Sequence, residues 1–84
     1  MTMEQIDFFL MTVRCDTFLE AAENLHIAQS TLSKQIQKLE SELNLTLFDR
    51  TRRQAVLTPA GELFCQEASE LSRQYHCLLY TSDA

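Results

Sequence analysis

Residues 29 to 50 read QSTLSKQIQKLESELNLTLFDR, and the first fifteen of them have the pattern of one helix with two different faces. The apolar residues recur at steps of four, three and four, which is the spacing of a buried helix face: Leu32, Ile36, Leu39 and Leu43. The opposite face is polar and carries Ser30, Lys34, Gln37 and Ser41, with Lys38 beside them. Hydroxyls, amides and lysines suit contact with phosphates and base edges, although a solvated helix face has the same composition.

The composition predicts one small, mostly helical domain. The chain has 84 residues, 45% of them hydrophobic and 23% charged, with a single Gly and a single Pro. Its net charge of −5 is unusual for a protein that binds nucleic acid, because phosphate contacts normally come from a basic surface. The charge is unevenly distributed, however, and only residues 26–58 carry more basic than acidic side chains, five against three. A basic stripe on an acidic body still favours DNA, through few phosphate contacts.

The cysteines and the terminal residues indicate an intracellular protein without a metal site. Cys15, Cys65 and Cys77 are odd in number and widely spaced, with no neighbouring His pair, so we expect reduced thiols with packing roles. No apolar run approaches the roughly 18 residues that span a bilayer. The N-terminus carries acids where a signal peptide carries bases. The sequence therefore predicts a cytoplasmic protein that makes no membrane contact and needs no cofactor.

Two shorter helices are predicted before the polar one. Apolar residues at helical spacing predict a helix over residues 3–14, and Thr17 with Glu20 forms a capping box that opens a second helix over residues 18–25. A turn that contains His26 joins this helix to the third, and helix, short turn, helix is an arrangement that reads DNA. Ala28 has no capping side chain, so Ser30 is expected to cap the third helix in part.

A wing is predicted after the third helix. Asn44 tolerates the left-handed conformation of a helix stop, and residues 45–57 are expected to form a short β-hairpin. The polar tip of this hairpin contains Arg50, Arg52 and Arg53. Three arginines within four residues suit a wing that lies on the phosphate backbone or enters the minor groove, although a solvated loop is the alternative.

A long helix is predicted over residues 59–80. Thr58 is its expected N-cap, and Pro59 occupies the first helical position, where its missing N–H costs nothing. Its apolar residues follow the 3.5-residue repeat of a coiled-coil seam and predict a dimer interface: Phe64, Ala68, Leu71, Tyr75 and Leu78. Residues 81–84 continue neither the coiled-coil seam nor a helical pattern, and they are expected to be an unstructured tail.

From about Met3 to Leu78 the chain resembles the N-terminal DNA-binding segment of a LysR-type transcriptional regulator. The resemblance rests on an ordered series of motifs: FLEAAENLHI at 18–27, AQSTLSKQI at 28–36, LE at 39–40, LFDR at 47–50 and LTPAG at 57–61. It implies a winged helix-turn-helix over residues 1–58, with three helices and a short β-hairpin wing, followed by a linker helix that pairs two protomers. Asn44 stands where Gly is usual, and the wing tip lacks the usual Gly.

The resemblance also implies a set of residues that contact DNA. Helix 29–43 would enter the major groove, where Gln29 suits an adenine edge and the Thr31 methyl suits a thymine. Ser33, the lysines and the arginines suit phosphates. The full implied set is Gln29, Ser30, Thr31, Ser33, Lys34, Lys38, Arg50, Arg52 and Arg53.

The implied partners are a double-stranded DNA operator and a second copy of the chain bound through the linker helix. Full-length members of the family are often tetramers. A small-molecule effector would bind only through a C-terminal effector-binding domain, which these 84 residues do not include.

Two other classes of function compete with DNA binding. An enzyme is disfavoured because no nucleophile, base and orienting acid converge, and there is no glycine loop that would cradle a phosphate. A winged-helix module that binds protein instead of DNA is the main alternative, and the negative net charge favours it. The two differ in whether Arg52 and Arg53 carry a salt-dependent affinity for DNA.

Overall fold

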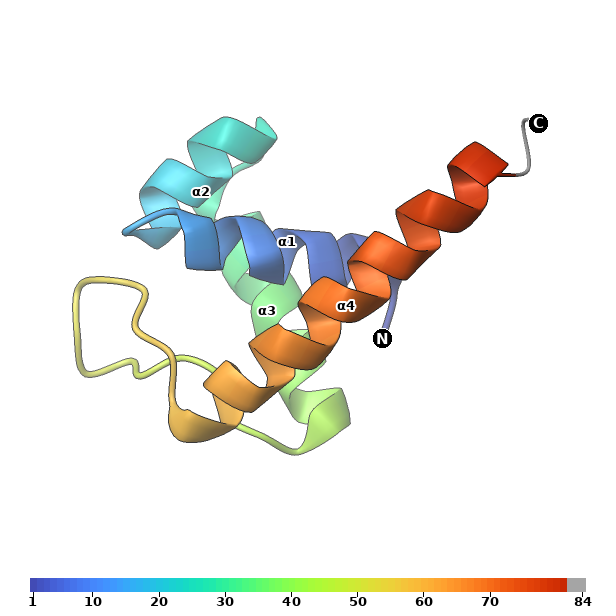
Figure 1. The fold of residues 1–84 in the computed structure, drawn as a ribbon. Coiled ribbons are helices and arrows are strands. Elements are labelled where there is room, and N and C mark those ends of the chain that lie inside the picture. Colours follow the sequence, from blue (N-terminus) through green and yellow to red (C-terminus); the bar gives the residue numbers. More distant parts are fainter. Residues whose placement is uncertain (82–84) are drawn as a thin grey trace.

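The computed structural model describes residues 1–81, and this part of the chain folds into four helices joined by short turns and one long loop (Figure 1). The helices are α1 (Met3–Arg14), α2 (Phe18–Leu25), α3 (Gln29–Leu43) and α4 (Pro59–Thr81). Their bounds agree with the predicted ones, and α4 extends one residue further than expected. Of the predicted tail, residues 82–84 lie outside the described residues. Within residues 1–81, no helix is long and apolar enough to cross a membrane.

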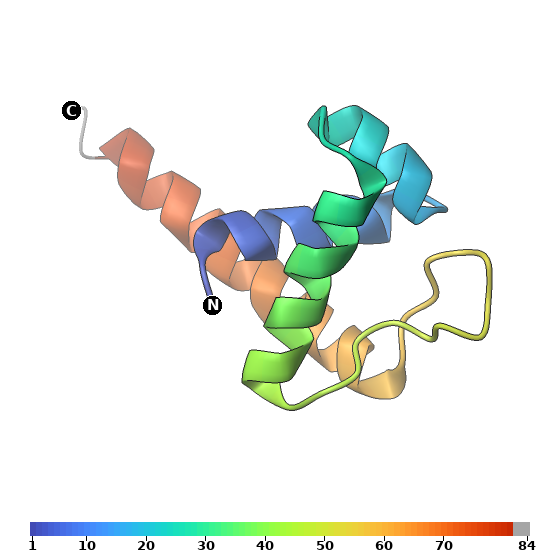
Figure 2. The same ribbon diagram turned by 180° about the vertical axis from the view of Figure 1, so that it is seen from behind.

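Helix α1 lies at the centre of the fold and contacts each of the other three helices. In Figures 1 and 2 it runs between α4 on one side and α3 on the other. The core is centred on the fully buried ring of Phe9, which packs 5.5 Å from the ring of Phe48 and 5.0 Å from that of Phe64. The predicted apolar face of α3 joins this core, because Leu32, Ile36 and Leu39 are fully buried. Burial of this face fixes which side of α3 remains exposed.

Local signals set most of the helix ends. Thr17 begins α2 by accepting a hydrogen bond from the Glu20 amide at 3.1 Å, which is one half of the predicted capping box. Asn44 ends α3 in the left-handed conformation, with φ at 54°, as predicted. The prediction for Ser30 is wrong, because Ala28 is the N-cap of α3 and no side chain caps this helix. His26 also adopts the left-handed conformation and closes α2.

One capping signal was overlooked. Thr2 accepts a hydrogen bond from the Gln5 amide, and the Gln5 side chain accepts one from the Thr2 amide, each at 3.1 Å. This reciprocal capping box begins α1.

The loop between α3 and α4, residues 45–58, is called the wing here. The expected hairpin is reduced to a single antiparallel bridge between Phe48 and Leu57. One physical reason is that the second strand of the expected hairpin, residues 55–57, also bonds outside the wing. The Ala55 amide donates to the carbonyl of Asp16, 2.8 Å away in the connection between α1 and α2. The wing projects on the same side as α2 and away from the far end of α4 (Figures 1 and 2).

The two halves of α4 have different surroundings. Thr58 begins the helix by accepting a hydrogen bond from the Gly61 amide at 3.0 Å, as predicted. The first half packs on the core, where Ala68 is buried and Phe64 contacts Phe9. The second half extends beyond the other helices and exposes apolar side chains: Leu71, Tyr75, Leu78 and Leu79.

Candidate nucleic-acid interface

The exposed side of α3 carries most of the residues predicted to contact DNA. Ser33 is half-buried, and the others on this helix are exposed: Gln29, Ser30, Thr31, Lys34 and Lys38. Within residues 1–81, none of these six side chains forms a hydrogen bond or an ion pair with another protein side chain. Because burial holds the opposite face against α1 and α2, α3 presents its polar side as a fixed surface.

The predicted residues of α3 do not form one cluster. A residue advances about 100° around a helix, so Gln29 and Ser33 face one flank, whereas Thr31 faces nearly the opposite one. Lys34 and Lys38 lie between these flanks, in the middle of the exposed surface, where they border a shallow depression. The predicted residues of α3 therefore divide into a flank directed at the wing, a central basic strip and the opposite flank with Thr31.

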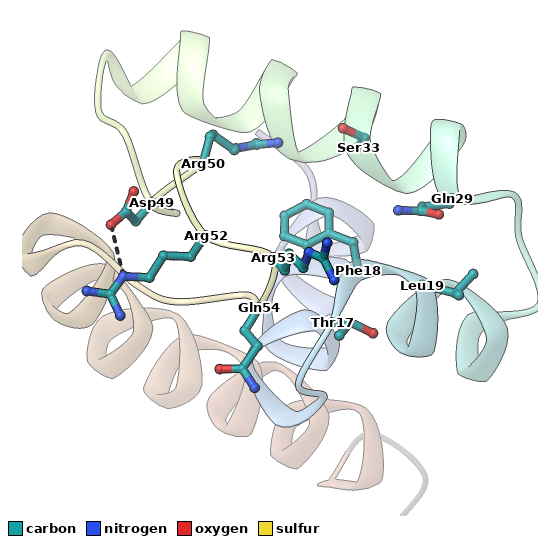
Figure 3. Close-up of a pocket in the computed structure, with 10 residues that line it drawn as sticks. All are labelled: Thr17, Phe18, Leu19, Gln29, Ser33, Asp49, Arg50, Arg52, Arg53 and Gln54. Carbon is teal, nitrogen blue, oxygen red and sulfur yellow. Dashed lines mark ion pairs between the residues drawn. The ribbon is translucent and has the colours of Figure 1, made fainter.

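The flank directed at the wing borders a hollow of about 400 Å³. Figure 3 shows that α3, the start of α2 and the wing each contribute to its walls. Gln29 and Ser33 line it from α3, and all three predicted wing arginines line it from the other side. The remaining lining residues come from the start of α2 and from the wing: Thr17, Phe18, Leu19, Asp49 and Gln54.

The three arginines of the wing are not equivalent. Arg50 bonds the Glu40 carboxylate at 2.9 Å, and its guanidinium lies 5.1 Å from the centre of the Phe18 ring. Arg52 is largely exposed and forms a longer ion pair with Asp49, at 3.6 Å, which Figure 3 marks with a dashed line. Arg53 is exposed, and no ion pair involves it among the described residues. Arg52 and Arg53 are therefore the more accessible cations.

The tip of the wing is shaped by Asp49. Its carboxylate accepts hydrogen bonds from the hydroxyl and from the amide of Thr51. These bonds, with a smaller contribution from the charge of Arg52, hold the pKa of Asp49 below its ordinary value. Asp49 is thus ionised at neutral pH, and it closes the turn that displays the arginines.

Sequence reasoning missed two groups that shape this surface. Phe18 appears in the sequence analysis only as part of a motif, yet its half-buried ring packs 5.2 Å from Phe48 and also supports Arg50. Glu40 was noticed only as part of a motif, yet it bonds the wing at three points. A signal was available for Glu40, because helical spacing places this acid on the same flank as Gln29 and Ser33.

The predicted dimer seam is divided by the fold. Phe64 and Ala68 pack within their own protomer, whereas Leu71, Tyr75 and Leu78 remain exposed. Across residues 1–81, no group of His, Cys, Asp and Glu side chains is placed to hold a metal ion.

The sequence model of a family described as bacterial regulatory helix-turn-helix protein, lysR family, matches residues 3–62. The chain belongs to this family. The LysR-family match covers all three helices of the helix-turn-helix region, the wing and the first residues of α4.

Curated relatives of this LysR-family chain are much longer than it is. An uncharacterized HTH-type transcriptional regulator, YcgK of Bacillus subtilis, is 43% identical over 79 residues, which are 94% of the chain and 24% of the relative. A probable RuBisCO transcriptional regulator of Cyanidioschyzon merolae is 44% identical over 70 residues, which are 83% of the chain and 23% of the relative. The chain thus spans about a quarter of the length of these relatives.

Solved structures of LysR-family domains have the same fold. The BenM DNA-binding domain in complex with benA site 1 DNA superposes with a TM-score of 0.95 at 35% identity, covering 99% of this chain and 96% of that one. Full-length CbnR in complex with its target DNA gives a TM-score of 0.92 at 28% identity, covering all of this chain and 29% of that one. The chain therefore has the winged helix-turn-helix architecture of this family.

Proposed function

We propose that this LysR-family chain is the DNA-binding part of a transcriptional regulator that recognises a double-stranded operator. Helix α3 enters the major groove, and the wing follows the phosphate backbone or enters the minor groove. The observation that carries the proposal is that Gln29 and Ser33 of α3 line the same hollow as the three wing arginines. Base-reading and phosphate-binding groups are thereby presented together on one surface.

The comparisons support this assignment, because BenM and CbnR domains of the same fold have been solved in complex with DNA. Within the proposal, Gln29 and Thr31 read base edges, and the hydroxyls and lysines of α3 contact phosphates: Ser30, Ser33, Lys34 and Lys38. Arg52 and Arg53 bind the backbone from the wing. Binding to chromosomal DNA in the cytoplasm requires no catalytic group and no cofactor.

The test is a titration of the whole chain against random duplex DNA, followed by fluorescence anisotropy at low and at physiological salt. We expect affinity to fall steeply as salt increases. Neutralising both wing cations, as Arg52→Gln with Arg53→Gln, should weaken binding to every sequence and lower the salt slope by about two. Arg14→Gln on α1 removes one positive charge outside this surface and serves as the control.

The result also separates the two main functions. If a chain shown to be folded and dimeric binds no duplex at either salt concentration, the DNA-binding assignment is wrong. A winged-helix module that binds protein would then be the better explanation.

We further propose that two copies pair through the exposed second half of α4. Leu71, Tyr75 and Leu78 supply an apolar strip with no partner surface among the described residues, and 69% of the Leu78 surface is exposed. Pairing would bury this strip and place two copies of α3 on one operator, with half-sites about one helical turn or a multiple of it apart. The small-molecule effector of a complete regulator would bind a separate domain.

Sedimentation equilibrium tests the pairing. Leu71→Glu with Leu78→Glu should shift the chain toward monomer and leave its helical content unchanged, because these side chains lie outside the core. Leu63→Glu changes another exposed leucine of α4 and is the matched control. An unchanged mass for the double variant would rule out this interface.

A further inference from the structure

One carboxylate on α3 collects three hydrogen bonds from the wing. Oε2 of Glu40 accepts from the Leu47 amide at 2.7 Å and from the Phe48 amide at 3.3 Å. Oε1 accepts from Nη2 of Arg50 at 2.9 Å. Only 14% of the Glu40 side chain is exposed, and its bonds to the two amides are partly buried, whereas its bond to Arg50 lies at the surface. A single side chain therefore joins α3 to the residues that begin the wing.

Arg50 extends this connection to α2. Its guanidinium, bonded to Glu40, lies over the Phe18 ring at 5.1 Å, within the range of a cation–π contact. The same ring packs edge-on against Phe48 at 5.2 Å. The guanidinium is thus held between an acid of α3 and an aromatic ring of α2. Figure 3 draws Arg50 and Phe18 and shows the Arg50 side chain beside α3.

We infer that Glu40 and Arg50 act as a positioning pair, which fixes the wing relative to α3 so that Arg52 and Arg53 reach the DNA backbone. This inference rests on the proposed function. It changes the role that the sequence implied for Arg50, from a group that contacts DNA to one that acts through Glu40 and the wing. Arg52 and Arg53 are then the cations that face the phosphates.

The weak pairing of the wing explains why such a pair is needed. The wing has one antiparallel bridge, between Phe48 and Leu57, where a hairpin would have a ladder of main-chain bonds. The amides of Leu47 and Phe48 find their acceptor in Glu40. Charge-assisted bonds of this kind are stronger than bonds between neutral groups, so one carboxylate replaces part of the missing ladder.

The effect of removing Glu40 on DNA affinity should be opposite to the effect expected from its charge alone. Glu40 is an acid on the flank of α3 that faces the wing, where a negative charge repels phosphate. Removing an acid from a surface that binds DNA should strengthen binding or leave it unchanged if charge alone matters. If Glu40 positions the wing, removing the same acid should weaken binding.

The first experiment measures the wing without DNA. Amide hydrogen exchange by NMR on the whole chain should show faster exchange at Leu47 and Phe48 in Glu40→Met, which keeps a side chain of similar length but accepts no such bonds. Exchange in the middle of α3 should be unchanged. Glu40→Gln retains one acceptor oxygen, so its exchange rates at these two amides should lie between those of the wild type and of Glu40→Met. This variant keeps the test usable if the Met variant folds poorly. Equal exchange rates in the wild type and both variants would overturn the inference.

The second experiment measures affinity for duplex DNA. We expect Glu40→Met to weaken binding about tenfold, by analogy with the loss of charge-assisted contacts. Glu42→Met removes an exposed acid two residues further along α3, and it should bind equally well or more tightly. If Glu40→Met binds as tightly as Glu42→Met, the positioning role is wrong even though DNA binding stands. If the wild type binds no DNA, the proposed function itself fails.

The third experiment assigns the role of Arg50. Arg52→Gln with Arg53→Gln removes the two cations that the Glu40–Arg50 pair is proposed to position. If the pair acts only in this way, breaking it in the double variant should have no further effect on binding. Adding Arg50→Gln should then change affinity less than twofold and leave the salt slope unchanged. A further tenfold loss, with a slope lower by about one, would show that Arg50 contacts a phosphate directly and would overturn this part of the inference.

Discussion

Helix α3 and the wing border the same hollow, yet they are held in place by different forces. The position of α3 depends on burial, because Leu32, Ile36 and Leu39 have no exposed surface. The wing is anchored at its base by Leu47 and Phe48, and the partly buried Ala55 and Leu57 pack against the same core. Its tip, residues 49–54, depends on polar contacts. Base reading is therefore assigned to α3, which has a rigid hydrophobic support. Binding to the DNA backbone is assigned to the wing, whose tip depends on a few polar contacts.

The largest effect is expected from Ile36→Ala in α3. Ile36 is fully buried, and its truncation leaves a cavity in the core shared with α1. We expect the free energy of unfolding to fall by about 2–5 kcal/mol, a large fraction of the stability of a domain of this size. Urea denaturation followed by circular dichroism measures this change. Gln37→Ala, one residue later and exposed, should change stability by less than about 0.5 kcal/mol.

The next effect concerns the base of the wing and is expected from Gly61→Ala. A Cβ at Gly61 would lie 2.1 Å from the Leu47 carbonyl oxygen and 3.0 Å from its carbon, so main-chain atoms must move. The same carbonyl accepts the Thr58 amide at 2.9 Å, and a shift would disturb this bond as well. We expect a loss of about 1–3 kcal/mol in the free energy of unfolding.

Chemical shifts separate the two regions in this variant. The amides of Leu47 and Thr58 should shift more than those in the middle of α3. Uniform shifts throughout α3, with none in the wing, would show that the wing is not coupled to α4 as described.

The contrast between the two regions also explains how much the sequence could predict. Helix periodicity, the Asn44 stop and the Thr58 cap are local signals, and the structure confirms them. The geometry of the wing depends on bonds between distant residues, such as Ala55 to Asp16 and Leu47 to Glu40, which no local pattern encodes. A hairpin was therefore expected where one bridge forms.

The interface shows the same limit. Residue type and spacing indicated a polar face on α3 and a cluster of arginines after it. Helical spacing places Gln29 and Ser33 on one flank and Thr31 on the other. It did not indicate which flank faces the wing, because that depends on how α3 is rotated against α1 and α2. In α4, the heptad pattern treated Phe64 and Leu71 alike, although the fold packs the partly buried Phe64 against Phe9 and leaves Leu71 exposed.

An effect of similar size, confined to binding, should distinguish the two regions by sequence preference. Gln29→Ala on α3 should cost about 1–3 kcal/mol on the preferred operator and relax the preference at one base pair. Arg53→Gln on the wing should weaken binding to all sequences alike. Selection from a randomised duplex library, carried out with each variant, measures both outcomes. Equal relaxation by the two variants would mean that the wing also reads bases.

The smallest effect is expected from the pH dependence of the wing tip. Bonds from Thr51 lower the pKa of Asp49 in the folded chain. A carboxyl with a lowered folded pKa stabilises the fold above its unfolded pKa of about 3.9, and this contribution is lost as the pH falls through the folded pKa. The tip should therefore be insensitive to pH between about 5 and 8, and the Thr51 amide signal should titrate with a midpoint below about 3.9. Asp49→Asn should abolish this titration, and a midpoint at or above the unfolded value would contradict the assignment of Asp49 as the acceptor that closes the turn.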